Sequence, residues 1–195
     1  MIPILKKYAE LKSAEASCPK AELFRRHNRK NLEWRILGSV CDLLKIAGLD
    51  HPFLAEEKDP PDFVTYREDN SLWSEVEITE VLEPGRKRNE EMNSGMEPVP
   101  GYIYPIPPPL KEPFLGLRHA VLEKVKKPYA PNCVLIVYFN IGNCAISYES
   151  DKFAPHLQEE VSKQPFDGVG NFKRVLVLSS DMTELVELIA EDRRS

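Results

Sequence analysis

The sequence predicts an α/β protein in which a mixed sheet is flanked by helices. Segments with helical periodicity alternate along the 195 residues with short runs rich in β-branched and aromatic residues. That alternation is typical of a sheet whose faces are covered by helices. Hydrophobic residues make up 42% of the chain and charged residues 29%, which excludes a wholly disordered protein. We expect a single domain over residues 1–195, with its core at about 20–140 and an αβ extension at about 141–195.

The first predicted elements are a long helix and three strands. Within residues 20–47, apolar side chains recur at helical spacing: Leu32, Ile36, Val40 and Leu43. Gly48 follows as a plausible helix stop. Three strands are expected next, over residues 52–56, 62–67 and 72–81, with a turn at 68–71 that folds the third strand back on the second.

A proline-rich segment separates these elements from the second half of the chain. Residues 87–113 are charged and then rich in proline, which is incompatible with a regular helix or a central strand. We therefore expect a loop insertion there. The elements expected after it are a helix at 114–127, a buried strand at 133–139, a strand at 144–148, a helix at 153–163, a strand at 174–178 and a closing helix at 182–191. Ser179-Ser180-Asp181 reads as the N-cap of that closing helix.

The charge and the apolar pattern exclude some classes of protein. A net charge of -5 argues against a uniformly basic nucleic-acid binder, although local basic patches occur at 25–30, 86–88 and 124–127. No apolar run approaches the roughly 18 residues of a membrane span, and the N-terminal residues are too short for a secretory leader. We expect no membrane association and a cytoplasmic location. The four cysteines have no zinc-type spacing, so reduced thiols are expected.

Carboxylates are concentrated between Asp59 and Glu83. In a strand alternate side chains share a face, so two sets are expected on opposite faces: Trp73, Glu75, Glu77 and Thr79 on one, and Leu72, Val76 and Ile78 on the core side. The turn at 68–71 would bring Asp62 near Glu77. Converging oxygen ligands of this kind suit a hard divalent cation such as magnesium. The alternative is a solvated acidic face, with Asp62 merely capping a turn.

Pro61-Asp62, followed by Glu75-Val76-Glu77 or Glu77-Ile78-Thr79, resembles the motif of the PD-(D/E)xK superfamily of restriction-endonuclease-like nucleases. The resemblance covers roughly residues 25–140. It implies a restriction-endonuclease-like fold and hydrolysis of a phosphodiester bond in nucleic acid, with DNA as the expected substrate. It also implies Mg²⁺ or Mn²⁺ as cofactor and a metal-activated water as the nucleophile. A glutamate on the first helix is common in this superfamily, and Glu33 is the matching residue.

The motif lysine of the superfamily is absent from this chain. If Glu75 is the motif acid, Glu77 stands in place of the lysine; if Glu77 is the acid, Thr79 does. We prefer the second register, because Glu77 is flanked by core residues. A lysine displaced to the next helix, Lys124 or Lys127, is a further expectation.

In the preferred register, the resemblance implies that Asp62 and Glu77 coordinate the cation. The carbonyl of Ile78 would add an oxygen, and Glu33 would act directly or through water. Glu75 is the metal ligand of the other register. Two alternatives stay open: a catalytically inactive member that retains the fold as a binding or interaction protein, and a homodimer, since many nucleases pair their sites on two strands.

Overall fold

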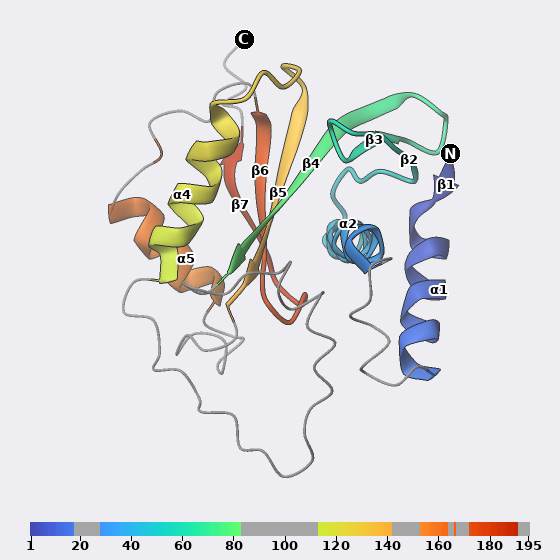
Figure 1. The fold of residues 1–195 in the computed structure, drawn as a ribbon, viewed down its shortest axis with the longest axis horizontal. Coiled ribbons are helices and arrows are strands. Elements are labelled where there is room, and N and C mark those ends of the chain that lie inside the picture. The colour runs from blue at the N-terminus through green and yellow to red at the C-terminus, as the bar shows by residue number, and fades with distance from the viewer. Residues whose placement is uncertain (18–27, 83–112, 142–152, 164–165, 167–171, 191–195) are drawn as a thin grey trace.

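The computed structural model describes residues 1–17, 28–82, 113–141, 153–163, 166 and 172–190 (Figure 1). The helices in these ranges are α1 (Ile4–Ser17), α2 (Asn28–Ile46), α4 (Pro113–Val125) and α5 (Phe153–Lys163). The strands are β1 (Ile2–Pro3), β2 (Leu54–Glu57), β3 (Phe63–Tyr66), β4 (Leu72–Leu82), β5 (Cys133–Asn140), β6 (Phe172–Leu178) and β7 (Leu185–Ala190). The structure confirms the expected α/β class, with a mixed seven-stranded sheet.

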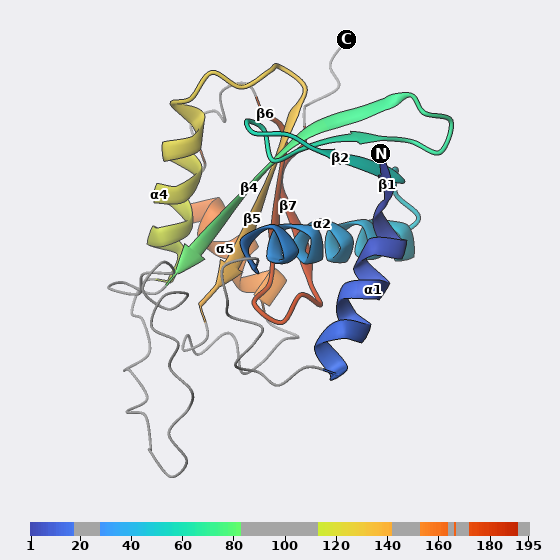
Figure 2. The same cartoon turned by 45° about the vertical axis from the view of Figure 1, so that its right-hand side comes forward.

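The strands lie in the sheet in the order in which they occur in the chain, from β1 to β7. Strands β1 to β4 form an antiparallel meander, β4, β5 and β6 are parallel, and β7 is antiparallel to β6. A parallel pair needs a long crossover connection, and helices α4 and α5 lie in the two crossovers of this sheet. Both pack on one side of it, while α1 and α2 lie on the other (Figures 1 and 2).

Strand β5 forms the centre of the core, as its continuous apolar run predicts. Its first seven residues are buried, and alternate side chains enter different layers. Val134, Ile136 and Tyr138 join the cluster that includes residues of α2. Cys133, Leu135, Val137 and Phe139 join the cluster that includes residues of α4 and α5. The sheet is therefore buried on both faces along this strand.

The predicted closing helix at 182–191 is wrong, because β7 occupies Leu185–Ala190. The Ser179 hydroxyl accepts the N–H groups of Thr183 and Glu184, as an N-cap would, but the contact closes a turn between β6 and β7. Met182 has a φ of 61° in that turn, a left-handed backbone conformation that is not part of a helix start. The residues of β7 then pair with β6 as an antiparallel strand.

One assignment of side chains to faces of β4 is also wrong. Thr65 pairs with Ser74 but Tyr66 pairs with Leu72, so Trp73 is an extra residue in a β-bulge. The bulge shifts the alternation by one residue. Trp73 therefore joins Val76 and Ile78 in the core instead of the acidic face, and Leu72 is 51% exposed.

The remaining elements agree with the sequence to within a few residues, apart from the N-terminal segment. Strand β1 and helix α1 were not expected, and the helix predicted from residue 20 is described only from Asn28. Most of the loop insertion at 87–113 and the strand expected at 144–148 lie outside the described residues. None of the helices in the described ranges is both long enough and apolar enough to cross a membrane.

Candidate active site

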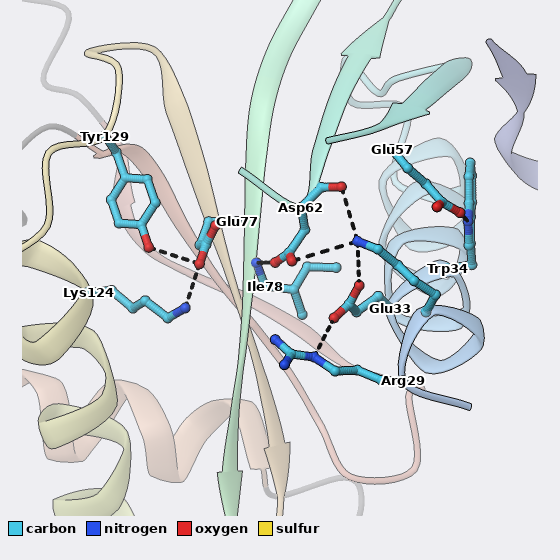
Figure 3. A network of polar contacts seen from close by, with 10 residues as sticks. Arg29, Glu33, Trp34, Glu57, Asp62, Glu77, Ile78, Lys124 and Tyr129 are labelled. Atoms are coloured by element: carbon cyan, nitrogen blue, oxygen red, sulfur yellow. Dashed lines mark hydrogen bonds and ion pairs between the residues drawn. The ribbon is translucent and has the colours of Figure 1, made fainter. Parts of the chain in front are cut away.

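Asp62 lies where strand β3 begins, beside the part of β4 that continues beyond it. Phe63 pairs with Val76, so β3 offers no partner to the following residues of β4. Oδ2 of Asp62 accepts the N–H of Ile78 at 2.7 Å and takes the place of a strand partner. The carboxylate is thereby fixed at the edge of β4 (Figure 3).

Glu33, in helix α2, lies on the same side of β4 as the carboxylate of Asp62 (Figure 3). Its two oxygens are 2.9 Å from Nε of Arg29 and 2.8 Å from Nζ of Lys30, both in the preceding helical turn. Lys30 Nζ also lies 3.9 Å from Oδ1 of Asp62 and 3.4 Å from its backbone oxygen. Glu33 is buried, as are Leu37, Val40 and Leu44 on the same helical face, which confirms the expected inward direction.

Glu77 points to the other face of the sheet, since Ile78 beside it belongs to the core cluster that includes α2. Its Oε1 is 2.5 Å from Nζ of Lys124 and accepts the hydroxyl of Tyr129 at 2.8 Å. Lys124 comes from α4, and Tyr129 from the connection between α4 and β5. Lys124, which the sequence suggested, therefore does reach Glu77, whereas Lys127 is exposed.

The close approach of α4 to β4 explains how Lys124 reaches Glu77. A Cβ atom at Gly116 would lie 3.0 Å from Cγ1 of Val81, so the helix touches the strand there. From Gly116 to Lys124 the helix advances about 12 Å, at about 1.5 Å per residue. From Val81 back to Glu77 the strand covers about 13 Å, at about 3.3 Å per residue. The lengths match when helix and strand run in opposite directions.

The three central carboxylates are removed from water. Glu33, Asp62 and Glu77 are 6%, 8% and 7% exposed, which contradicts a solvated acidic face. Burial, followed by the negative charges of Glu33 and Glu77, raises the pKa of Asp62 to about 6, although the Ile78 N–H and Lys30 act in the opposite sense. Burial and the bond to Glu77 raise the pKa of the Tyr129 hydroxyl.

The other residues singled out in the sequence lie at the margin of this group. Glu75 is partly exposed and its Oε1 lies 3.3 Å from Nζ of Lys58. Thr79 is half-buried, two residues after Glu77 on the same strand face. Ile78 contributes its N–H to Asp62. Lys30 and Tyr129 were not expected to contact the carboxylates of this site. For Lys30 the sequence did contain a signal, because it lies three residues before Glu33, a spacing at which helical side chains interact.

The donors at this site suit a hard divalent cation, since carboxylate and backbone carbonyl oxygens are the ligands that Mg²⁺ prefers. Burial is the main cause of the raised pKa of Asp62, and the negative charges of Glu33 and Glu77 add to it. Within the described ranges no three His, Cys, Asp or Glu side chains form a metal-binding group. Glu77 turns toward α4 while Glu33 and Asp62 meet near α2 (Figure 3).

The chain was compared with protein-family models, with curated proteins and with solved structures. None of these comparisons gave a significant match.

Proposed function

We propose that this protein is a metal-dependent nuclease that hydrolyses a phosphodiester bond of nucleic acid, with DNA as the expected substrate and Mg²⁺ or Mn²⁺ as cofactor. The observation that carries the proposal is the pairing of buried Glu77 with Lys124. Glu77 lies one residue before Ile78, whose N–H the carboxylate of Asp62 accepts. The order of strands and helices around this site supports a restriction-endonuclease-like arrangement. Both features lie in the part of the chain that resembles the PD-(D/E)xK superfamily.

The position of Lys124 supports the proposal at the main departure from the motif. In the register Glu77-Ile78-Thr79, a threonine stands where the superfamily has its lysine. Lys124 brings an ammonium group from α4 to the face of β4 that carries Glu77, and Thr79 shares that face. The side chain of Lys124 is 16% exposed, so its charge acts in a poorly solvated place where it has a large effect.

Asp62 and Glu77 would hold the cation, with Glu33 and the carbonyl of Ile78 as further oxygen donors; Glu77, which faces Lys124 on the other side of β4, would have to turn toward Asp62 to do so. When bound, the cation supplies Lewis acidity toward phosphate oxygens and lowers the pKa of a water molecule. Lys124 would donate from Nζ to a non-bridging phosphate oxygen and offset the charge that develops there. Tyr129 holds the Glu77 carboxylate in one orientation through its hydroxyl. Arg29 and Lys58, both largely exposed, would attract the phosphate backbone.

A catalytically inactive binding protein is the second candidate, and one observation favours it. Each of the three buried carboxylates already contacts a basic side chain: Glu33 with Arg29 and Lys30, Asp62 with Lys30, and Glu77 with Lys124. Such a site is electrically balanced without metal. A protein of this kind would bind nucleic acid through its basic rim without cutting it.

The test is cleavage of single- and double-stranded oligonucleotides with Mg²⁺, Mn²⁺ or chelator. We expect metal-dependent cleavage by the wild type, and a loss of at least about a hundredfold in Asp62→Ala, Glu77→Gln and Lys124→Met, as when a group that stabilises developing charge is removed. Glu80→Gln is the matched control, because Glu80 lies on the same strand but accepts a bond from Asn140.

Two results would contradict the proposal in different ways. Cleavage that survives in Glu77→Gln and Lys124→Met would remove the assigned roles. Binding of nucleic acid by the wild type without cleavage under any metal condition would favour the inactive alternative.

A further inference from the structure

The ammonium group of Lys30 is surrounded by oxygen atoms of the kind that a metal ion uses. Its Nζ lies 2.8 Å from Oε2 of Glu33, 3.9 Å from Oδ1 of Asp62 and 3.4 Å from the backbone oxygen of Asp62. The ring of Phe63 closes a further side, with its centroid 5.0 Å from Nζ. Two elements, α2 and the start of β3, thus meet around one positive charge.

With the positive charge of Lys30, the site has as many basic as acidic side chains. Glu33, Asp62 and Glu77 provide the buried negative charges, and their basic partners are Arg29, Lys30 and Lys124. A divalent cation entering between Glu33 and Asp62 would add two positive charges to a balanced set. Repulsion between like charges at a few ångströms would then have to be relieved by the departure of a basic side chain.

Lys30 is the basic side chain best placed to leave. Its contacts with Asp62 are long, and its side chain is 38% exposed, so the ammonium can reach water by rotation of the stem. Lys124 is 16% exposed and makes the shorter contact with Glu77. Arg29 contacts only Glu33 among the three carboxylates and does not stand between α2 and β3.

We propose that Lys30 is a tethered counter-cation, which holds Glu33 and Asp62 together until a divalent metal ion takes the place of its ammonium group. The inference rests on the proposed function, because it takes the metal site as given and assigns a role to a residue outside the motif. Lys30 keeps two buried carboxylates compatible with folding before metal binds, and for the same reason it weakens metal binding. Released into solvent, it remains beside the site as a positive charge for a phosphate group.

The experiment measures metal binding rather than cleavage. Mn²⁺ is titrated calorimetrically at pH 7.5 into the full chain, into Lys30→Met and into Lys45→Met. Lys45→Met is the charge-matched control, since Lys45 is exposed in the last turn of the same helix. We expect the Kd of Lys30→Met to fall roughly tenfold, about the effect of one partly screened like charge. The Kd of Lys45→Met should stay within twofold of the wild type.

Thermal unfolding gives a second readout. With chelator, Lys30→Met should melt below the wild type, because Glu33 and Asp62 lose their shared cation; saturating Mn²⁺ should raise its Tm by more than it raises that of the wild type. If Lys30→Met does not fold, Lys30→Gln replaces it, since glutamine keeps a hydrogen-bond donor without the charge.

The possible results separate the two proposals. Equal or weaker Mn²⁺ binding by Lys30→Met, with clear binding by the wild type, overturns the role of Lys30 and leaves the proposed nuclease standing. Binding heat that persists in Asp62→Asn places the metal elsewhere and overturns this inference. No heat with any of the proteins overturns the counter-cation role together with the metal site.

Discussion

The raised pKa of Asp62 predicts that this residue destabilises the fold at neutral pH. The pKa lies at about 6 in the folded protein, against an ordinary value of 3.8. Between these two values the folded state binds more protons than the unfolded state, so the free energy of unfolding must fall as pH rises. This destabilisation of the folded protein is absent below about pH 4 and fully present above about pH 6. This is the opposite of the usual carboxylate.

The perturbation that tests this is Asp62→Asn. Asparagine is uncharged at every pH, and its Oδ1 can still accept the N–H of Ile78. A pKa difference of about two units, at about 1.36 kcal/mol per unit, gives an upper value near 3 kcal/mol. We therefore expect Asp62→Asn to be about 2 to 3 kcal/mol more stable than the wild type at pH 7.5, and equal to it near pH 4.

The assay is urea unfolding followed by circular dichroism, in chelator, at several pH values from 4 to 8. Asp50→Asn is the control, because the bond from Arg67 lowers the pKa of Asp50 below its ordinary 3.8; this carboxylate stays ionised across the assay range, so the variant should be less stable than the wild type by an amount that hardly changes with pH. Stability curves of wild type and Asp62→Asn that run parallel across this range would refute the reasoning. So would an Asp62→Asn protein that is less stable at pH 7.5.

Two further predictions concern the packing around the site. Tyr129→Phe removes a donor to the buried Glu77 carboxylate but keeps the ring beside Phe172, so urea unfolding at pH 7.5 should show a loss of about 1 to 2 kcal/mol. That loss should largely disappear when Glu77→Leu, which has no acceptor oxygen, is already present; an equal loss in both backgrounds would contradict the contact. Gly38→Ala should destabilise by about 1 to 3 kcal/mol although alanine favours helices, because the new Cβ would lie 2.5 Å from Cγ of Tyr8. An unchanged midpoint in the same assay would show that α1 does not pack on α2 as described.

Some of this site was predictable from the chain alone. The periodicity that places Glu33 with Leu37 and Leu44, and the strand alternation that separates Glu77 from Ile78, both follow from local geometry. The suggestion of Lys124 required only that a helix follow the acidic strand. Its contact with Glu77 depends on the close approach at Gly116, which no local pattern specifies.

Other features were misread because the same residues serve two local structures. Ser179 accepts backbone N–H groups in a turn as readily as at a helix start, so only pairing with β6 decided that β7 is a strand. The bulge at Trp73 likewise depends on the partner strand, since a single extra residue reverses the face of every residue before it.

The sequence by itself determined the α/β class, most elements and most of the core positions, because these depend on periodicity within one segment. The tertiary structure decided how the carboxylates are grouped: Asp62 meets Glu33 across Lys30, while Glu77 turns to Lys124 and Tyr129. The contacts of Lys30 with Asp62 and of Glu77 with Lys124 and Tyr129 join residues 32 to 52 positions apart. They require helices on both faces of the sheet, because the interaction between charges depends on their distance in space rather than along the chain.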